Sequence, residues 1–200
     1  MEAQLANVRA HAARLDHEWD ERAIDWPLTQ DSIVVEVGGY TGRWALQIAE
    51  RYHPRLFVFE PQPWAADVCR KALGEAATVL SYGLGSATAM LSMGEWETDG
   101  CSFIKEGTTS AWMHEVGAAF RELAIAHIDL MLMNIEGYEY TLIPHMLDHG
   151  ILPRRLMVQF HPFTDEQKAI QAQIYERLAA LGYTIPWSYG VILTAWECAV

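Results

Sequence analysis

Short apolar runs alternate with amphipathic stretches along most of the chain. The runs at 33–37, 56–59, 77–82, 128–135 and 156–160 are predicted to be buried strands. Between them lie stretches whose apolar positions recur three and four residues apart, which is the spacing of one helix face. Strand and helix alternating in this way predict an open α/β fold with a parallel sheet.

Helical spacing predicts helices within 1–26, directly after Gly42, and over about 64–73, 114–124 and 138–149. In the last of these, Pro144 predicts a kink or a late start. A final helix is marked most clearly, because Thr164 and Gln167 have the spacing of a capping box and Gly182 supplies a stop. Its apolar face is expected to consist of Ile170, Ile174, Leu178 and Leu181.

The segment 86–112 gives the weakest pattern. It carries glycines with scattered serine and threonine, and it predicts irregular chain with one or two short strands. Beyond the final helix, 183–187 and 191–199 are predicted as a closing pair of strands. They must run antiparallel if they are neighbours, because the connection between them is short; the alternative is that they splay across a third strand.

Together these elements predict one Rossmann-like α/β domain over 1–200, with an N-terminal helical segment at 1–26 and the core at 33–200. We expect a mostly parallel seven-stranded sheet flanked by helices, with an antiparallel last strand. A chain of 200 residues is long enough for one sizeable core. The sequence does not indicate an oligomeric state.

Composition and net charge indicate a globular protein and argue against some classes of partner. Apolar residues make up 51% and charged residues 20%, as in globular proteins. The formal net charge of −12 argues against a nucleic acid or an anionic membrane as a partner, because both attract basic surfaces. The polar first residues and the lack of a long apolar run predict neither a signal peptide nor a membrane span. Cys69, Cys101 and Cys198 lack metal spacing and fit a reduced, cytoplasmic setting.

Candidate chemistry begins where the first strand turns into a helix, in the segment Glu36-Val37-Gly38-Gly39-Tyr40-Thr41-Gly42. Glycines let a ligand approach the backbone there, and the helix N-terminus presents free N–H groups. The GxGxxG fingerprint of dinucleotide sites would need glycines at positions 40 and 43, where this chain has Tyr40 and Arg43. A P-loop is also excluded, because no Gly-Lys-Ser/Thr follows. An acidic strand residue followed by G-x-x-x-G is instead the pattern of S-adenosylmethionine sites. The alternative is an ordinary turn between strand and helix.

Two further strand ends carry polar residues. Glu60 closes the second strand, where a carboxylate can accept both hydroxyl hydrogens of a ribose; the alternative is a solvated acid. Asn134-Ile135-Glu136-Gly137 closes the fourth strand and should face the same crevice. The alternative there is a turn whose polar groups only cap the next helix.

The blocks VVEVGGYTG, LFVFEPQP, SYGLG, IDLMLMNIEGYEYTL and LMVQFHP together resemble the FkbM-type methyltransferases, from about Ile33 to His161. The resemblance implies a class I methyltransferase fold and S-adenosylmethionine as the methyl donor. It also implies a hydroxyl oxygen as the acceptor, on a sugar or another small molecule. The most specific part is the block around I-D-L and E-G-x-E.

The resemblance also implies roles for single residues. Glu36, Gly38 and Gly42 would line the methionine end of the cofactor, and Glu60 would bind its ribose. The turn Gly83-Leu84-Gly85 would lie near the adenine, while Asn134, Glu136 and Gly137 would border the acceptor. The residues expected to contact the cofactor are Glu36, Gly38, Gly39, Tyr40, Gly42, Glu60, Pro61, Gly83, Leu84 and Asn134.

The chain departs from the family pattern at three positions. Asn134 and Gln159 stand where the family commonly has acids, and Leu132 stands where lysine is common. An amide can form a hydrogen bond but does not take up a proton or bind a metal well. A second hypothesis is therefore a protein that binds S-adenosylmethionine without transferring methyl, as a sensor or partner subunit. A third hypothesis is an oxidoreductase that uses a dinucleotide, which is disfavoured because the sequence lacks the GxGxxG motif.

Transfer to an alcohol requires a base. His161 is the first candidate, because it ends the fifth strand and its neutral form is available near pH 7; the alternative is a histidine bonded to nearby backbone. Glu136 and His114 are weaker candidates. His145 and His149 have metal-ligand spacing but no third ligand, so an exposed helix face is favoured and no metal is expected.

Three tryptophans lie near the candidate site. Trp44 and Trp64 follow the first two strand-end turns. Trp112 lies in the irregular segment, where anchoring of a long loop in the core is favoured over part of a lid above the acceptor.

Overall fold

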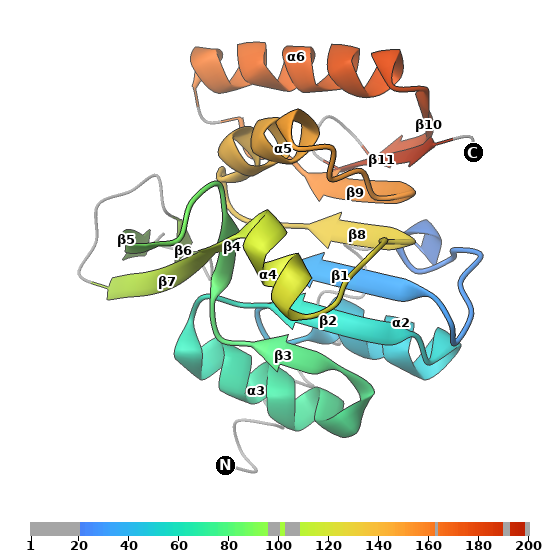
Figure 1. Cartoon of the computed structure of the whole chain (residues 1–200), viewed down its shortest axis with the longest axis vertical. Helices are drawn as coiled ribbons and strands as arrows, with labels where there is room; N and C mark the ends of the chain where they lie inside the picture. Colours follow the sequence, from blue (N-terminus) through green and yellow to red (C-terminus); the bar gives the residue numbers. More distant parts are fainter. Residues whose placement is uncertain (1–20, 96–100, 103–108, 163, 190–192, 199–200) are drawn as a thin grey trace.

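The computed structural model describes residues 21–95, 101–102, 109–162, 164–189 and 193–198, and a seven-stranded sheet forms its centre (Figure 1). Its strands are β1 (Ile33–Val37), β2 (Arg55–Phe59), β3 (Thr78–Leu80), β8 (Leu130–Met133), β9 (Arg155–Gln159), β10 (Tyr183–Tyr189) and β11 (Leu193–Cys198). Their order across the sheet is β10-β11-β9-β8-β1-β2-β3. Pairing is parallel from β9 to β3, and β11 runs antiparallel to both neighbours. The predicted fold class is confirmed, including its antiparallel last strand.

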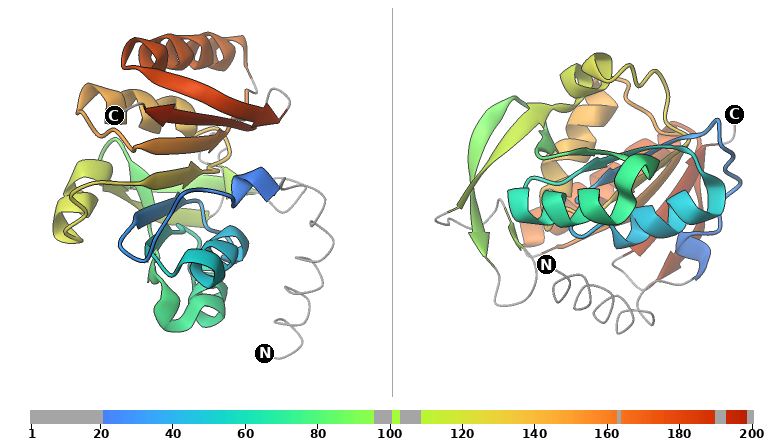
Figure 2. Two further views of the ribbon diagram at one scale, coloured as in Figure 1. Left: turned by 90° about the vertical axis from the view of Figure 1, so that its right-hand side faces the viewer. Right: turned by 90° about the horizontal axis from the view of Figure 1, so that it is seen from below.

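Helices cover both faces of this sheet, as the edge-on view in Figure 2 shows. One face carries α2 (Arg43–Tyr52) and α3 (Pro63–Leu73); the other carries α4 (Val116–Glu122), α5 (Glu139–Asp148) and α6 (Asp165–Ala180). Two short 3-10 helices are η1 (Glu21–Ala23) and η2 (Gly74–Ala76). The helix predicted for the first twenty or so residues lies outside the described residues.

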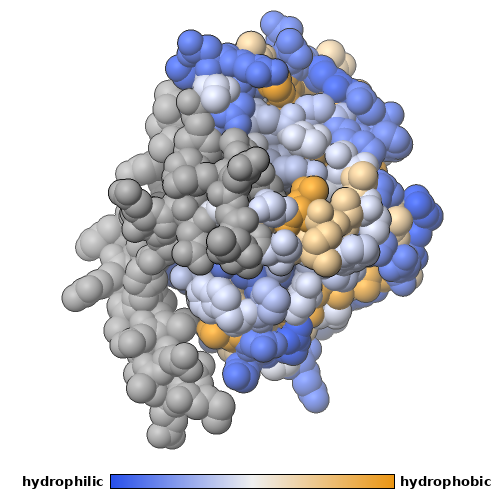
Figure 3. All heavy atoms as spheres, turned by 90° about the vertical axis from the view of Figure 1, so that its left-hand side faces the viewer, coloured by the Kyte–Doolittle hydropathy of each residue, from blue (hydrophilic) through white to orange (hydrophobic). Residues whose placement is uncertain are grey.

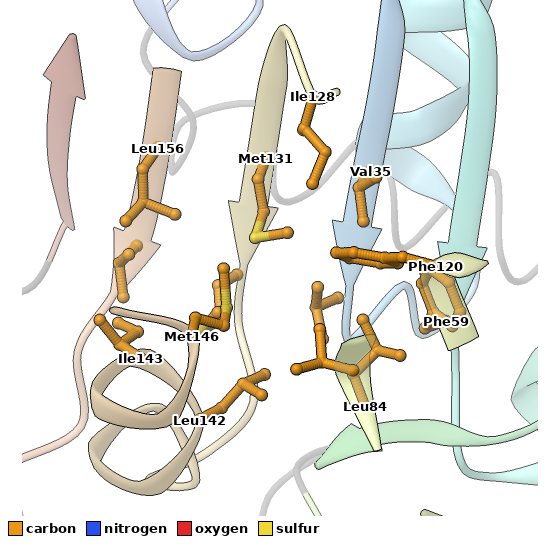
Figure 4. Packing of buried hydrophobic residues seen from close by; sticks show 14 of the residues in the cluster. Val35, Phe59, Leu84, Phe120, Ile128, Met131, Leu142, Ile143, Met146 and Leu156 are labelled. Atoms are coloured by element: carbon orange, nitrogen blue, oxygen red, sulfur yellow. The ribbon is translucent and has the colours of Figure 1, made fainter. Parts of the chain in front are cut away.

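β1 shows why the central strands are apolar throughout. Successive side chains point to opposite faces, so Val34 packs toward α2 and α3 while Val35 packs toward α4 and α5. Figure 4 shows the second of these clusters, where Val35 and Met131 lie on the same side of the sheet as Phe120 of α4. Each large apolar side chain buried in this way contributes roughly 1.5–3 kcal/mol. Glu36 breaks the pattern, because it is a carboxylate buried on the same face as Val34.

The ends of α6 follow the predicted signals. Thr164 Oγ1 accepts the N–H of Gln167, Gln167 Oε1 accepts the N–H of Thr164, and Gly182 adopts a φ of +86° after the last turn. The apolar face is shorter than predicted, because Leu181 is the C-cap and is exposed. In α5 the helix continues through Pro144, so the predicted late start is wrong.

A second sheet corrects two expectations. It consists of β4 (Gly83–Gly85), β5 (Ala89–Glu95), β6 (Cys101–Ser102) and β7 (Thr109–Glu115), in the order β4-β7-β5-β6. Within 86–112 the described residues are therefore mainly strands, with β5 antiparallel to both β6 and β7, and 83–85 form a strand parallel to β7 rather than a turn. The alternation was hidden because Met90 and Trp112, which pair across the ladder, are both exposed. Anchoring of Trp112 in the core is therefore wrong.

This second sheet lies at the side of the molecule toward which β1, β2, β8 and β9 point (Figure 1). Figure 3 looks onto that side, where hydrophilic and hydrophobic residues are mixed across the coloured surface. The candidate site lies between the carboxyl ends of the parallel strands and this second sheet. Among the described residues, no helix is long and apolar enough to cross a membrane.

Candidate functional site

The turn from β1 to α2 is pressed against its neighbours. A Cβ at Gly38 would lie 1.9 Å from the backbone oxygen of Asn134, and one at Gly39 would lie 2.1 Å from Cγ1 of Val58. Gly38 and Gly42 also have φ values of +84° and +81°, which side chains rarely adopt. The glycines are therefore required by close approach and by backbone conformation, and the turn is left without side chains at these points.

Glu60 holds this turn to the end of β2. Its Oε2 accepts the N–H of Tyr40 at 2.7 Å and its Oε1 accepts the N–H of Gln62 at 2.8 Å. The side chain is 3% exposed, and burial raises its pKa to about 7 even though these two hydrogen bonds lower it. A carboxylate offers about four lone-pair positions, so roughly two remain for hydroxyl donors of a ligand. Glu60 fixes the turn and keeps acceptor capacity at its edge.

Glu36 lies beneath the same turn. The N–H of Ala45, in the first turn of α2, donates to its carboxylate, and Oε2 lies 3.5 Å from where a Cβ of Gly39 would be. Oε2 is buried without a hydrogen-bond partner among the described residues. Burial, together with the charge of Glu60, raises the pKa of Glu36 well above its ordinary value. A buried acceptor without a donor is costly, so this oxygen is suited to a ligand or water donor.

Asn134, at the end of β8, is a second buried acceptor at this edge. Its backbone N–H donates to the oxygen of Val37, which ties it to the end of β1. Its side-chain Oδ1 has no hydrogen-bond partner in the described part of the chain. Unpaired acceptors from β1 and β8 thus border the glycine turn on two sides, as a site for a polar ligand would require.

Aromatic rings stand at the other end of the turn. Tyr40 has a φ of +46°, rare for a bulky residue, and its ring meets that of Trp64 edge-on at 5.4 Å. Trp64 is half exposed, and its Nε1–H donates to Oε1 of Gln62 at 2.9 Å. Trp44 is instead part of the core, where its Nε1–H donates to the oxygen of Ala23. Of these two tryptophans, Trp64 is the one placed to meet a ligand.

Histidine and carboxylates meet where β8 and β9 end. Oε1 of Glu139, the first residue of α5, accepts the backbone N–H of His161 at 2.6 Å and lies 3.2 Å from its Nδ1. On the other side of the ring, Nε2 lies 3.5 Å from Oε1 of Glu136 and 3.3 Å from Nε2 of Gln159. The structure therefore brings together the two predicted catalytic residues, His161 and Glu136.

These carboxylates set the protonation of the ring. Burial lowers the pKa of His161, but the hydrogen bond to Glu139 and the charge of Glu136 outweigh it and raise the pKa above its ordinary value. Burial raises the pKa of Glu136, the charge of His161 lowers it, and Glu139 raises it further. The two carboxylates stabilise the protonated ring and so make the neutral His161 ring a stronger proton acceptor, which favours general-base chemistry.

Glu139 was missed by sequence reasoning. It lies in the E-G-x-E block, but an acid in the first turn of a helix is ordinary, because it complements the helix dipole. The signal that could have found it is its spacing from Gly137, whose N–H donates to the other oxygen, Oε2. The long-range contact to His161 cannot be deduced from that spacing.

The remaining predicted residues lie in different surroundings. A Cβ at Gly83 would lie 2.6 Å from Sδ of Met113 and 3.4 Å from Cβ of Pro61, so the structure places Gly83 and Pro61, two of the predicted cofactor contacts, side by side. Leu84 points into the core (Figure 4), which leaves its backbone as the part that can meet a ligand. His114 is turned away toward α4, where its Nε2 lies 3.6 Å from Oε2 of Glu122.

His145 and His149 line a cleft of about 590 Å³ between α4 and α5. Their ring centres lie 4.1 Å apart with the ring planes tilted by 38°, and Nε2 of His145 lies 3.0 Å from Oε1 of Glu115. The predicted exposed helix face holds for His149 and is wrong for His145, which is largely covered. Among the described residues, no group of three or more His, Cys, Asp or Glu side chains could hold a metal ion.

Solved methyltransferases share this fold. An rRNA methylase from Streptococcus thermophilus matches with a TM-score of 0.53 and 14% identity, over 86% of this chain and 90% of that chain. A candidate methyltransferase from Streptococcus mutans in complex with S-adenosylhomocysteine matches with a TM-score of 0.54 and 13% identity, over 85% and 90%. Fibrillarin from Aeropyrum pernix with natively bound S-adenosylmethionine matches with a TM-score of 0.53 and 9% identity, over 88% and 70%.

These likenesses show that the chain has the Rossmann-like fold of class I methyltransferases. Comparison with family models found no match, and neither did comparison with curated proteins. The resemblance to the FkbM type thus stands on the residues quoted above.

Proposed function

We propose that the chain binds S-adenosylmethionine where β1 and β2 end and transfers its methyl group to a hydroxyl oxygen. The observation that carries the proposal is the buried, unpaired oxygen of Glu36 beneath a turn whose glycines leave no room for side chains. Two proteins of the same fold contain S-adenosylmethionine or S-adenosylhomocysteine, which supports this choice of ligand. The GxGxxG motif of dinucleotide sites is lacking, which argues against a hydride-transfer enzyme.

The residues divide the cofactor between them. Glu36, Gly38 and Gly42 would face the methionine end, with Asn134 as a further acceptor for its ammonium group. Glu60 would accept the ribose hydroxyls through its remaining lone pairs. Gly83 and Pro61, which lie against each other, would border the adenine. Gly39 and Tyr40, in the turn itself, would contact the part of the cofactor between its methionine end and its adenine.

The second half of the site would handle the acceptor. When bound, the cofactor supplies a methyl group on a positively charged sulfur, which keeps the electron pair of the broken C–S bond. The acceptor oxygen forms the new bond to carbon, and its proton must go to a base. We assign this base to His161, whose pKa is raised by its carboxylate neighbours, and we assign Glu136 the stabilisation of the imidazolium that forms.

A small hydroxylated molecule or a sugar is the acceptor that we favour. The resemblance to FkbM-type enzymes supports a hydroxyl oxygen, and the net charge of −12 disfavours a polyanionic acceptor such as RNA. A protein of the same fold is an rRNA methylase, so RNA belongs among the acceptors tested. A reduced, cytoplasmic setting is part of the proposal and is consistent with the free thiols of Cys69 and Cys198.

Transfer of a labelled methyl group tests the proposal. The protein is incubated with methyl-labelled S-adenosylmethionine and pooled alcohols, sugars and RNA, and labelled products are separated by size. We expect a labelled small-molecule ether from the wild type and at least tenfold less from His161→Ala. Label in RNA alone would contradict the assigned acceptor class, and equal turnover by the variant would remove His161 as the base.

A second candidate function rests on the two amides, Asn134 and Gln159, that stand where acids are common in the family. In this case the chain binds S-adenosylmethionine and acts as a sensor or partner subunit without transferring methyl. Binding with no labelled product from any pool would favour this function over the first.

A further inference from the structure

Glu139 is the most deeply buried carboxylate near the proposed acceptor site, with a side chain that is 0% exposed. A buried carboxylate is tolerated when its oxygens are hydrogen-bonded. Oε2 accepts the N–H of Gly137 at 2.7 Å, within the turn before α5. Oε1 instead reaches across to β9, where it meets both the backbone N–H and Nδ1 of His161. The second oxygen therefore serves the histidine rather than its own helix.

This contact determines which ring nitrogen carries the proton. Glu139 Oε1 can only accept, so Nδ1 of His161 must donate to it across 3.2 Å. In the neutral ring the lone pair then lies on Nε2, opposite Glu139. The side-chain nitrogen of Gln159 lies 3.3 Å from Nε2, which fits an amide donor that faces this lone pair until an acceptor hydroxyl takes its place. An ionised histidine would instead donate from both nitrogens, to Glu139 and to Glu136 at 3.5 Å.

We propose that Glu139 is a positioning residue: it holds the Nδ1–H of His161 so that Nε2 faces the acceptor hydroxyl and receives its proton. This inference rests on the proposed function and adds to it a residue that does not itself touch the reacting atoms. The proton moves from the hydroxyl oxygen to Nε2, and the oxygen keeps the electron pair with which it forms the new bond. The imidazolium then lies between two carboxylates, with Glu139 at Nδ1 and Glu136 at Nε2.

Other groups around the ring agree with this role. Glu136 on the β8–α5 turn, Glu139 on α5 and uncharged Gln159 on β9 are polar side chains that lie close to it. Both carboxylate charges favour the protonated ring, in line with the raised pKa of His161. Loss of either charge should lower that pKa, but only loss of Glu139 should also release the tautomer.

The test measures the His161 ring directly, by long-range 1H–15N correlation over a pH titration, with signals assigned through His161→Gln. In the wild type we expect the neutral ring to carry its proton on Nδ1. In Glu139→Gln we expect the pKa to fall by about one unit or more and the neutral ring to become a mixture of tautomers. The kcat should fall at least tenfold, with its pH inflection shifted downward and the KM for S-adenosylmethionine unchanged.

Glu122→Gln is the matched control, because it removes a carboxylate beside a different histidine, His114. It should leave the titration of His161 unchanged. A cooperatively unfolding Glu139→Gln protein with the wild-type pKa and tautomer would overturn the proposal. If that variant does not fold, the wild type decides: a neutral His161 with its proton on Nε2 overturns the proposal, and one with its proton on Nδ1 supports it. Absent methyl transfer beside the expected titration would contradict the proposed function and not the Glu139–His161 pair.

Discussion

The two halves of the sheet edge are built on different principles. Where β1 and β2 end, glycines, backbone N–H groups and two buried acids with raised pKa values form the site. Where β8 and β9 end, side chains far apart in sequence form a network around one histidine. The first half is shaped by backbone approach and the second by side-chain contacts. In our account the first binds the donor and the second treats the acceptor.

The difference suggests that donor binding and acceptor chemistry, although they share one sheet edge, respond differently to substitution. Donor binding depends on conformations that glycine alone adopts easily, so there are few ways to build it. The acceptor half depends on the identity of a few side chains, and here two of them, Asn134 and Gln159, are amides. Changes in the first half should therefore abolish binding, whereas changes in the second should adjust protonation and turnover.

The largest effect is expected from Gly38→Ala. The new Cβ would lie 1.9 Å from the backbone oxygen of Asn134, and the alanine would have to adopt a φ of +84°. We therefore expect a loss of roughly 2–4 kcal/mol in unfolding free energy, and no ligand binding. Gly150→Ala is the matched control. It has a φ of +66° but no described atom within 4 Å of the new Cβ, so about 1 kcal/mol of backbone strain is expected. Denaturant unfolding of both proteins measures the difference; equal losses would refute the close packing of the turn.

The next effect is on ligand binding by Glu60→Gln. At pH 8 the affinity for S-adenosylhomocysteine should fall roughly 10- to 100-fold, because charge-assisted hydrogen bonds to the ribose are lost. The pKa of Glu60 is about 7 in the free protein, and only the ionised form accepts both hydroxyls, so wild-type affinity should weaken as the pH falls below 7. The variant should lack that weakening. A wild-type affinity that is flat between pH 6 and 8 would argue against Glu60 as the ribose acceptor.

A smaller effect is expected on the stability of the ligand-free protein. Because its folded-state pKa of about 7 exceeds its ordinary value of 4.5, Glu60 keeps a proton in the folded state that the unfolded chain has lost. Unfolding free energy should therefore fall as the pH rises from 4.5 toward 7 and beyond, by about 1 kcal/mol between pH 6 and 8. The raised pKa of Glu36 acts in the same direction. Thermal unfolding of the wild type and of Glu60→Gln measures it, and a wild type that gains stability from pH 6 to 8 relative to the variant would contradict the sign.

The smallest effect concerns the acceptor half. Gln159→Glu would place a further carboxylate near Nε2 of His161, which Gln159 now approaches at 3.3 Å. We expect the pKa of His161 to rise by roughly half a unit to one unit, with binding of S-adenosylhomocysteine unchanged. Ring titration by nuclear magnetic resonance measures the shift. A pKa that stays the same would place the side chain of residue 159 away from the ring.

The same division explains what the sequence could predict. The strands that carry or precede Glu36 and Glu60 are apolar runs followed by glycine or an acid. Local patterns of this kind were the basis for predicting the fold and the residues proposed to bind the donor. The pairing of β5 with β7 was missed because Met90 and Trp112, which lie opposite each other in the two strands, are both exposed, and this removes the alternation of apolar and polar positions. The link between Glu139 and His161 was missed because it joins different elements, and such contacts depend on packing rather than on periodicity.

The central claim is that S-adenosylmethionine binds where β1 and β2 end, and calorimetric titration of the wild type at pH 8 tests it most directly. The account predicts one-to-one binding of S-adenosylhomocysteine with a Kd of roughly micromolar order, sharply weakened in Glu60→Ala, and no heat from NADH. No binding of S-adenosylhomocysteine to the folded wild type would contradict it. The glycine turn would then be a structural connection between β1 and α2.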